Sequence, residues 1–182
     1  MNSQLLRRDS MGTEANPVHP MKQSNRGPLR TGLHFGLTSG VITTLGLIVG
    51  LHAGTHSTLA VVGGVLTIAV ADACSDALGI HISEEGEHVH STREVWLATF
   101  ATFISKFFMA LTFLVPLRFF ALPTAIVTSI AWGLIVITLL SYQLARSQGA
   151  SPSKVIGEHL GIAVLVVALT HALGDWVRQV FT

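Results

Sequence analysis

VADACSDALGIHISEEGEHVH, residues 70–90, begins inside a long apolar run and leaves it through a cluster of acids and imidazoles. Asp72 and Asp76 lie where a membrane-spanning helix would hold them deep in lipid, at a cost on the order of a few kcal/mol for each bare charge. Proteins tolerate that cost when the groups are neutralised, paired or used on a polar pathway. These two aspartates are therefore the first candidates for function in the chain.

The composition is that of an integral membrane protein. Of the 182 residues, 49% are hydrophobic and only 12% carry charge, about half the charged fraction of a soluble domain. The apolar residues form continuous runs near the ~20 residues that a helix needs to cross a bilayer, whereas membrane strands alternate. We predict an all-α integral membrane protein of five transmembrane helices, at 32–51, 59–83, 95–117, 124–145 and 155–177. They form one transmembrane domain over residues 31–182, and residues 1–30 form a flexible basic tail.

The distribution of lysine and arginine predicts how the chain lies in the membrane. Eight of these residues lie on the side of the N-terminus and of the loop at 84–94, and two lie on the other side. Because basic residues are retained in the cytoplasm, we expect that side to be cytoplasmic and the protein to be integral to the cell membrane, the inner or plasma membrane. The eight are Arg7, Arg8, Lys22, Arg26, Arg30, Arg93, Arg146 and Lys154, and the two are Arg118 and Arg178.

Charge, cysteine content and motifs exclude several classes of function. The net charge of +1 predicts no nucleic-acid partner, and the expected surrounding is the lipid bilayer. Cys74 is the single cysteine, so neither a disulfide framework nor a thiolate metal cluster is available. The sequence contains no nucleotide-binding loop, no Gly-x-Ser-x-Gly and no His-Glu-x-x-His, so we do not expect an enzyme.

The first predicted span carries glycine at four-residue spacing twice. Small residues at that spacing make a flat helix face against which another helix backbone can lie closely. The face packs either within one subunit or in a homodimer through this first helix, and in both cases the first span is central. The glycines are Gly32, Gly36 and Gly40, followed by Gly46, Gly50 and Gly54.

Two polar stripes run along the second span toward the cytoplasmic side. At ~3.6 residues per turn, Asp72 and Asp76 project from nearly the same face, and the stripe continues through Ser83, Glu87 and His90 if the helix persists beyond Gly86. Carboxylate oxygens and imidazole nitrogens suit iron(II), manganese, zinc and similar ions, although residues 84–90 also fit a solvated acidic loop. The second stripe consists of His81, Glu84, Glu85 and His88.

Lys106 in the third span is a candidate partner for the aspartates. Asp72 lies 11 residues before Ser83, and Lys106 lies 11 residues after Val95, so the two are level in antiparallel helices. A buried ion pair would explain both residues and would leave Asp76 as the better candidate for transport. Alternatively, Lys106 releases Asp72 when a proton or a metal ion arrives.

Histidines also mark the opposite side of the predicted bundle. His52 and His56 are four residues apart, as are His171 and Asp175. Because histidine titrates near neutral pH, these residues could form an outer exit site or a proton relay. More often, residues of this kind are simply polar groups in the interfacial zone of the membrane, and we favour that interpretation.

Three segments resemble the vacuolar iron transporter family. They are GLTSGVITTLGLIVG (36–50), like the family's first helix, ADACSDALGIHIS (71–83), like its second-helix signature, and VPLRFF (115–120), like the end of its third helix. The resemblance covers residues 31–181 and implies five spans and a cytosolic N-terminus. It also implies a homodimer that moves iron(II) or manganese out of the cytosol in exchange for protons.

The sequence departs from the family at the positions that matter for metal. The family's first-helix aspartate falls on Ser39, and its second-helix methionine falls on Asp76. The glutamate and tyrosine of the family's Gly-Glu-Tyr segment fall on Ile80 and His81, and its large cytosolic metal-collecting domain shrinks to residues 84–94. Oxygen ligands without a thioether favour harder ions such as manganese, unless this branch has given up metal transport.

We therefore expect a dimeric transporter of iron(II) or manganese that exports the ion against protons and holds no permanent cofactor. Alternatives are a non-transporting scaffold or regulatory subunit with Asp72 and Lys106 as a structural lock, and a proton-coupled carrier of another small solute. The candidate metal ligands are Asp72, Asp76, Ser39, Thr43, Glu84, Glu85, Glu87, His88 and His90. The candidates for a proton relay or ion pair are Lys106, His81, His171 and Asp175.

Overall fold

The computed structural model describes residues 26–87 and 89–181, and these residues form helices without any strand. The helices are α1 (Arg26–Thr55), α2 (Thr58–Gly86), α3 (Thr92–Thr112), α4 (Leu114–Phe119), α5 (Leu122–Gln148) and α6 (Pro152–Phe181). Helices α3 and α4 continue one another, so five helical lengths are long and apolar enough to cross a membrane. The predicted class, an all-α protein with five membrane-spanning helices, is confirmed.

The helices extend beyond the apolar runs that predicted them. Helix α1 begins at Arg26, so the expectation of a tail reaching residue 30 is wrong for its last five residues, and residues 1–25 lie outside the described part. Pro28 is compatible with this start, because the first turn of a helix does not use its backbone N–H groups. The hydropathy pattern identifies only the part of a helix that lies in lipid. Backbone hydrogen bonds extend the same helix beyond that part, into the interfacial zone of the membrane.

Local sequence signals define the turns between the helices. The Ser57 side chain accepts a hydrogen bond from the backbone of Ala60 at the start of α2. Ser91 and Glu94 form a reciprocal capping box at the start of α3. Gly149 adopts a left-handed conformation, with φ of 66°, and ends α5. The turn at Ser57 makes α2 antiparallel to α1, and the turn at Ser91 makes α3 antiparallel to α2.

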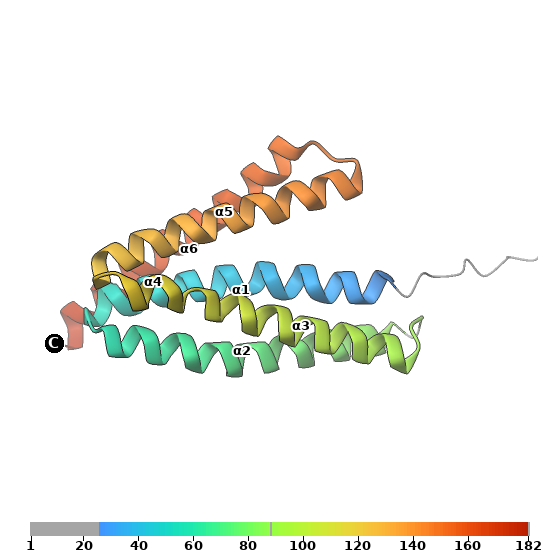
Figure 1. The fold of residues 1–182 in the computed structure, drawn as a ribbon, viewed down its shortest axis with the longest axis horizontal. Helices are drawn as coiled ribbons and strands as arrows, with labels where there is room; N and C mark the ends of the chain where they lie inside the picture. Colours follow the sequence, from blue (N-terminus) through green and yellow to red (C-terminus); the bar gives the residue numbers. More distant parts are fainter. Residues whose placement is uncertain (1–25, 88, 182) are drawn as a thin grey trace, which may run out of the picture.

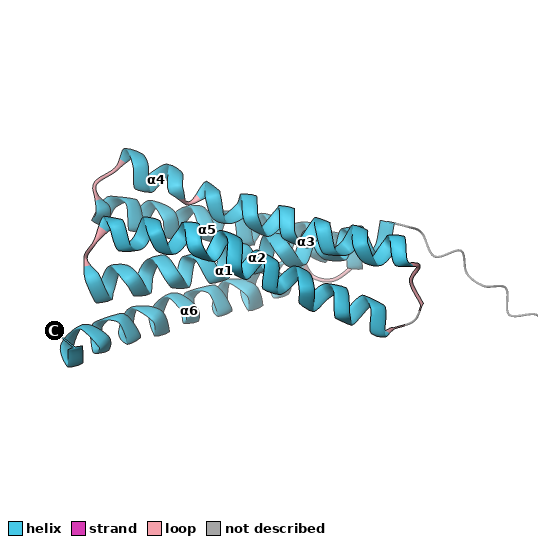
Figure 2. Cartoon of the chain, turned by 90° about the horizontal axis from the view of Figure 1, so that it is seen from below, coloured by secondary structure: helices cyan, strands magenta, loops and turns pink. Residues whose placement is uncertain are grey.

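The helices are arranged as a three-helix layer and a hairpin (Figures 1 and 2). Helices α1, α2 and α3 run alongside one another, and α5 and α6 form a hairpin that diverges from them toward the N-terminal end of α1. The start of α1 and the α2–α3 and α5–α6 connections lie at one end, and the C-terminus lies at the other. Among the described residues, the start of α1 and the end of α6 therefore lie at opposite ends of the bundle.

Helix α1 is the central element, as predicted, and contacts α2, α3, α5 and α6. Its glycines are used within the chain: Gly32, Gly36 and Gly40 lie against α3, and Gly46, Gly50 and Gly54 lie against α6. A Cβ atom added at Gly36 would lie 2.6 Å from the Thr102 carbonyl oxygen and would overlap the Ser105 hydroxyl. The structure thus favours packing within one subunit over a homodimer through these glycines.

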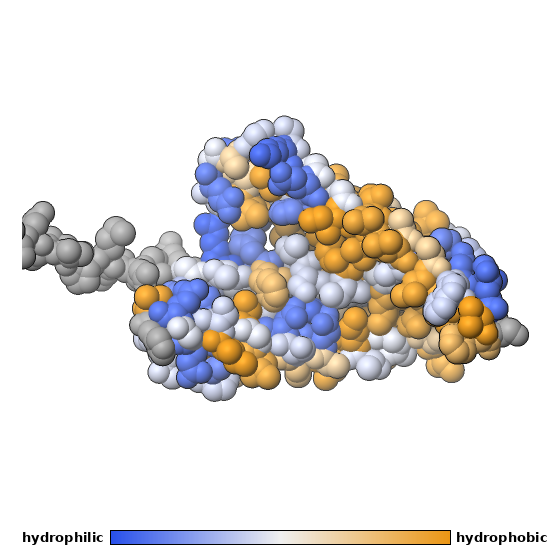
Figure 3. All heavy atoms as spheres, turned by 180° about the vertical axis from the view of Figure 1, so that it is seen from behind, coloured by the Kyte–Doolittle hydropathy of each residue, from blue (hydrophilic) through white to orange (hydrophobic). Residues whose placement is uncertain are grey.

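Apolar side chains fill the centre of the bundle and also cover its outside. The core includes Val41, Leu45, Ile48, Val61, Val65, Phe113 and Ile137 from four of the long helical lengths. Large apolar residues remain exposed along the outer faces of α2, α3, α5 and α6, as expected for a surface in contact with lipid. Figure 3 shows this apolar surface with hydrophilic residues gathered at the ends and in a patch midway along the three-helix layer.

The contact between α1 and α3 generates the first prediction. Gly36→Ala should lower the free energy of unfolding by about 1–3 kcal/mol, because the added methyl group overlaps the α3 backbone. Gly157→Ala is the matched control, since a Cβ at this α6 position meets nothing within 4 Å. Unfolding in detergent, followed by circular dichroism, measures both; equal stability of the two variants would contradict the close contact.

Candidate ion-binding site

Three helices place polar side chains at the same depth in the middle of the bundle. Asp72 is the central residue of α2, 14 positions from either end of the span Thr58–Gly86. Lys106 occupies the corresponding position in the span Thr92–Phe119, and Ser39 lies near the middle of Gly27–Thr55. Polar groups at this depth are costly in lipid unless they satisfy one another.

The Lys106 cluster consists of Lys106, Asp72, Asp76 and Ser39. The ammonium group of Lys106, whose side chain is only 2% exposed, lies 2.5 Å from Asp72 Oδ2 and also contacts Asp76 Oδ2. Lys106 Nζ donates to Ser39 Oγ at 2.9 Å, and Ser39 Oγ donates to Asp76 Oδ2 at 2.7 Å. One cation, two carboxylates and one hydroxyl are therefore joined across α1, α2 and α3.

The local sequence explains how these groups meet. Asp72 and Asp76 are one helical turn apart, so the long side chain of Lys106 can reach both carboxylates from α3. Gly40 lies against the backbone of Lys106, where a Cβ would approach its carbonyl oxygen to 3.2 Å. This close approach of α1 and α3 brings Ser39, the residue before Gly40, within hydrogen-bonding distance of the ammonium group.

The contacts agree with the candidate Asp72–Lys106 pair, and Asp76, which we expected to be the better candidate for transport, contacts the same ammonium group. Both carboxylates bind the same ammonium group, so depth alone does not distinguish their roles. Thr43, which we expected to offer an oxygen, instead donates its hydroxyl to the Ser39 carbonyl of its own helix at 2.9 Å. Ser39 does take part, but as a hydrogen-bond bridge between Lys106 and Asp76.

The charge balance of the Lys106 cluster is its main chemical property. With both aspartates ionised and Lys106 protonated, two negative charges face one positive charge, which leaves one excess negative charge. The aspartate side chains are 24% and 20% exposed, so the cluster is not sealed inside the chain. A site with this balance attracts one further positive charge, either a proton or a metal cation.

A second cluster, the α2-end cluster, consists of Glu84, Glu87 and His90. Each residue offers a ligand atom, and these atoms all lie within 4.8 Å of one another. Glu84 is buried, and its Oε2 lies 2.8 Å from His90 Nδ1. One imidazole and two carboxylates can bind a divalent transition metal.

The α2-end cluster differs from the predicted stripes because the helix does not persist beyond Gly86. The chain turns there and returns His90 to Glu84, so the cluster joins members of both predicted stripes. Glu85 is exposed and is not part of this group, and His88 lies outside the described residues. The helical periodicity of the sequence could not predict this arrangement, because the arrangement depends on the turn that follows α2.

His81 is held by the third helix. Its Nδ1 lies 2.9 Å from the Thr99 hydroxyl, and its ring packs edge-on against Trp96. These contacts connect α2 to α3 on the outer side of the layer. The proposed participation of His81 in a proton relay stays a prediction.

Histidines lie together at the opposite end of the bundle, as the sequence suggested. The rings of His52 and His56 are 5.2 Å apart between centroids. His171 Nε2 lies 3.4 Å from Asp175 Oδ2, and Asp175 Oδ1 accepts a hydrogen bond from Arg178 at 3.1 Å. The described residues thus carry polar groups at both ends and in the middle of the bundle.

Comparisons of the chain with protein-family models, with curated proteins and with solved structures found no match.

The Lys106 cluster generates a prediction about stability. Asp72→Asn or Asp76→Asn alone should change the free energy of unfolding little, because one carboxylate still neutralises Lys106. The double variant leaves a buried ammonium group without a counter-charge and should lose about 3–5 kcal/mol. Adding Lys106→Met to the double variant should restore much of that loss. Unfolding in detergent measures all four variants; a single variant as unstable as the double would contradict the sharing of Lys106.

Proposed function

We propose that this chain is a proton-coupled transporter of divalent transition-metal cations, iron(II) or manganese, in the cell membrane. We base this proposal on the second aspartate in the Lys106 cluster. One carboxylate is enough to neutralise a buried lysine, yet two carboxylates contact Lys106 at mid-depth. The excess negative charge supplies a place for a proton or a cation within a span.

The coupling of the two ions follows from competition for the same carboxylates. A divalent cation that binds Asp72 and Asp76 competes with the Lys106 ammonium group for the two carboxylates. The bound cation then neutralises these carboxylates in place of the ammonium group. A proton on either carboxylate removes one negative charge and therefore weakens the attraction of the cluster for the metal cation. Protons and metal ions therefore exclude one another at the cluster, which is the requirement for exchange.

The α2-end cluster is the proposed entrance. Glu84 lies eight residues after Asp76 on the same helix, a separation of roughly 12 Å at 1.5 Å per residue. Glu84, Glu87 and His90 would collect a dication at the end of α2 before it passes to the aspartates. The excess of lysine and arginine at this end supports a cytoplasmic location for it, and hence export.

The family resemblance supports the same function. The two positions at which a family ligand is replaced, Ser39 and Asp76, lie side by side, joined by a hydrogen bond of 2.7 Å. The acid of this pair is on the second helix instead of the first. We infer that the chain is a divergent member of the vacuolar iron transporter family in which the ligand set contains oxygen atoms and no thioether.

A structural role for the Lys106 cluster is the second candidate function. Lys106 is almost completely buried and joins three helices, which is what a lock in a non-transporting scaffold would require. In a scaffold, however, the single aspartate variants would leave every function intact. Transport measurements on those variants therefore separate the two candidates.

We also propose a homodimer, formed through α2 and not through the α1 glycines that α3 and α6 already occupy. The partly exposed carboxylates of α2 are unsuited to lipid, and a second copy would shield them. Small residues allow two helices to approach closely, and a Cβ at Gly63 or Gly79 meets nothing within 4 Å. The exposed small residues recur at every fourth position: Gly63, Thr67, Ala71, Ser75, Gly79 and Ser83.

Uptake by proteoliposomes tests the transport proposal. Asp76→Asn should reduce proton-driven manganese or iron(II) flux about tenfold or more, because losing a charge-assisted contact costs roughly 1.5–3 kcal/mol. Thr43→Ala is the matched control and should keep its flux, since the Thr43 hydroxyl bonds only to its own helix among the described contacts. Equal flux through Asp76→Asn, or flux of the unmodified protein no greater than that of empty liposomes, would contradict transport at the cluster.

Crosslinking of the native cysteine tests the dimer. Cys74 is exposed on α2, so a short bis-maleimide, which adds one thiol at each end, should yield covalent dimers when it is applied to membranes. The control is Cys74→Ser combined with Leu169→Cys, which moves the thiol to an exposed position of α6 and should leave the chain monomeric on denaturing gels. Dimers in the control but not in the native protein would place the interface on α6 and contradict the proposed face.

A further inference from the structure

The end of the bundle opposite the α2-end cluster holds three imidazoles that the proposed transport site does not use. His52 and His56 come from the end of α1, and His171 comes from α6 with Asp175 one turn later. His52 interacts electrostatically with both His56 and His171. We refer to His52, His56, His171 and Asp175 as the histidine cluster.

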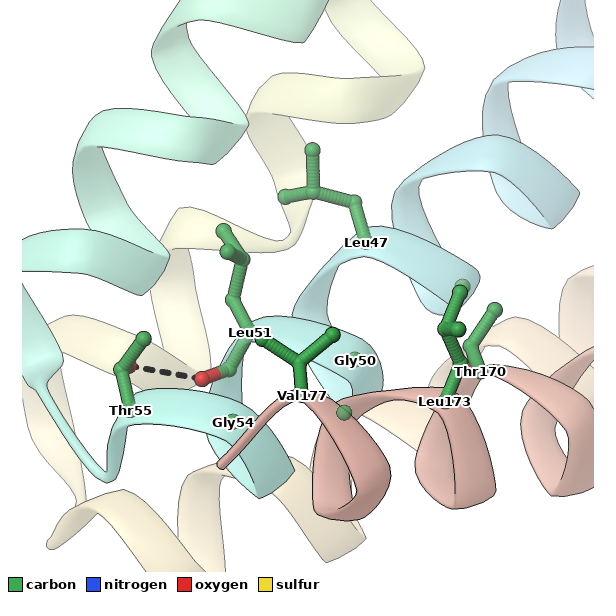
Figure 4. Close-up of a pocket in the computed structure, with 10 residues that line it drawn as sticks. Leu47, Gly50, Leu51, Gly54, Thr55, Thr170, Leu173 and Val177 are labelled. Carbon is green, nitrogen blue, oxygen red and sulfur yellow. Dashed lines mark hydrogen bonds between the residues drawn. The ribbon is translucent and has the colours of Figure 1, made fainter. Parts of the chain in front are cut away.

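A close crossing of α1 and α6 brings the histidine cluster together. A Cβ at Gly174 would overlap the Gly50 carbonyl oxygen and would lie 3.0 Å from the Gly54 backbone nitrogen. His52 lies between these two α1 glycines in sequence, and His171 lies one turn before Gly174. Figure 4 shows the two helices in contact here, beside an apolar groove of about 380 Å³.

His52 has the features of a ligand whose partner is absent. Its Nδ1 atom is buried and has no hydrogen-bond partner in the described structure. Buried polar atoms without a hydrogen-bond partner are rare in native proteins, so this nitrogen marks a candidate ligand position. A metal ion would satisfy this nitrogen directly.

The backbone of His56 supports the same interpretation. Its φ angle is +51°, in the left-handed region, where it is the one non-glycine residue among the described part of the chain. Conformations of this kind are uncommon outside glycine and gather at functional sites. Here the conformation turns the chain after α1 and leaves the His56 ring 5.2 Å from that of His52.

Asp175 is arranged to orient His171. Its Oδ2 lies 3.4 Å from His171 Nε2, and its Oδ1 accepts from Arg178, which also balances its charge. Metal-binding histidines commonly donate their second ring nitrogen to a carboxylate, which fixes the ring and raises its basicity. This contact leaves His171 Nδ1 available for a metal.

We propose that His52, His56 and His171 bind a divalent transition metal of the zinc type, with Asp175 positioning His171. Three imidazoles are a common protein ligand set for such ions. Among the described residues, only the α2-end cluster has three ligand atoms already within 4.8 Å of one another. Metal binding at the histidine cluster therefore requires the imidazole side chains to rotate toward one another. The site stands on its own contacts and does not depend on transport through the Lys106 cluster.

Isothermal titration of the full chain in detergent with Zn²⁺ alone tests this proposal. His52→Ala and His171→Ala should each remove one bound ion per chain, whereas Glu87→Gln should leave that ion bound. His34→Ala is the matched control, because His34 is a half-buried histidine near the other end of α1. Asp175→Asn should weaken the same ion about 10–100-fold without removing it.

A further variant separates binding from folding. His56→Ala changes an exposed side chain and should also remove the ion, so loss of zinc in this variant cannot be ascribed to a disrupted core. Unchanged stoichiometry and affinity in His52→Ala, His56→Ala and His171→Ala would overturn the proposal. If the unmodified protein shows no manganese or iron(II) flux above empty liposomes but still binds zinc at the histidine cluster, the transport proposal is refuted and this site stands.

Discussion

The sharing of one buried ammonium group by two carboxylates is the interaction on which the structure depends. The Lys106 side chain is 2% exposed and lies at the middle of its span. Its ammonium group therefore needs a negatively charged partner nearby in any arrangement of α3 against its neighbours. Most contacts around it are apolar and have little directional preference. The contacts of Lys106 with Asp72, Asp76 and Ser39 therefore provide the polar specificity that sets α1, α2 and α3 in register.

That register requires the helices to approach closely, and α1 achieves this with glycine on two parts of its length. In its first half, Gly36 and Gly40 admit the α3 backbone, and this brings the Lys106 ammonium group to Ser39. In its second half, Gly50 and Gly54 admit α6. Glycine therefore supports the central cluster in one half of α1 and the histidine cluster in the other, because small residues let side chains within one turn of them meet across the helix contact.

The polar groups form a series along an otherwise apolar bundle. The α2-end cluster lies at one end, the Lys106 cluster in the middle and the histidine cluster at the other end. All three clusters contain carboxylates, and the two at the ends also contain imidazole. Groups that can bind cations at successive depths along the bundle are consistent with the proposed function.

The residue pattern was sufficient for the number of spans and the helical class, and it placed Lys106 level with Asp72 as a candidate partner. Each follows from hydropathy or depth, which a helix possesses before it meets any partner. The pattern did not reveal that Asp76 joins the same lysine, that the α1 glycines are covered by α3 and α6, or that His90 returns to Glu84. These contacts depend on how each helix is rotated and how closely its neighbours approach, and only packing in three dimensions sets those two quantities.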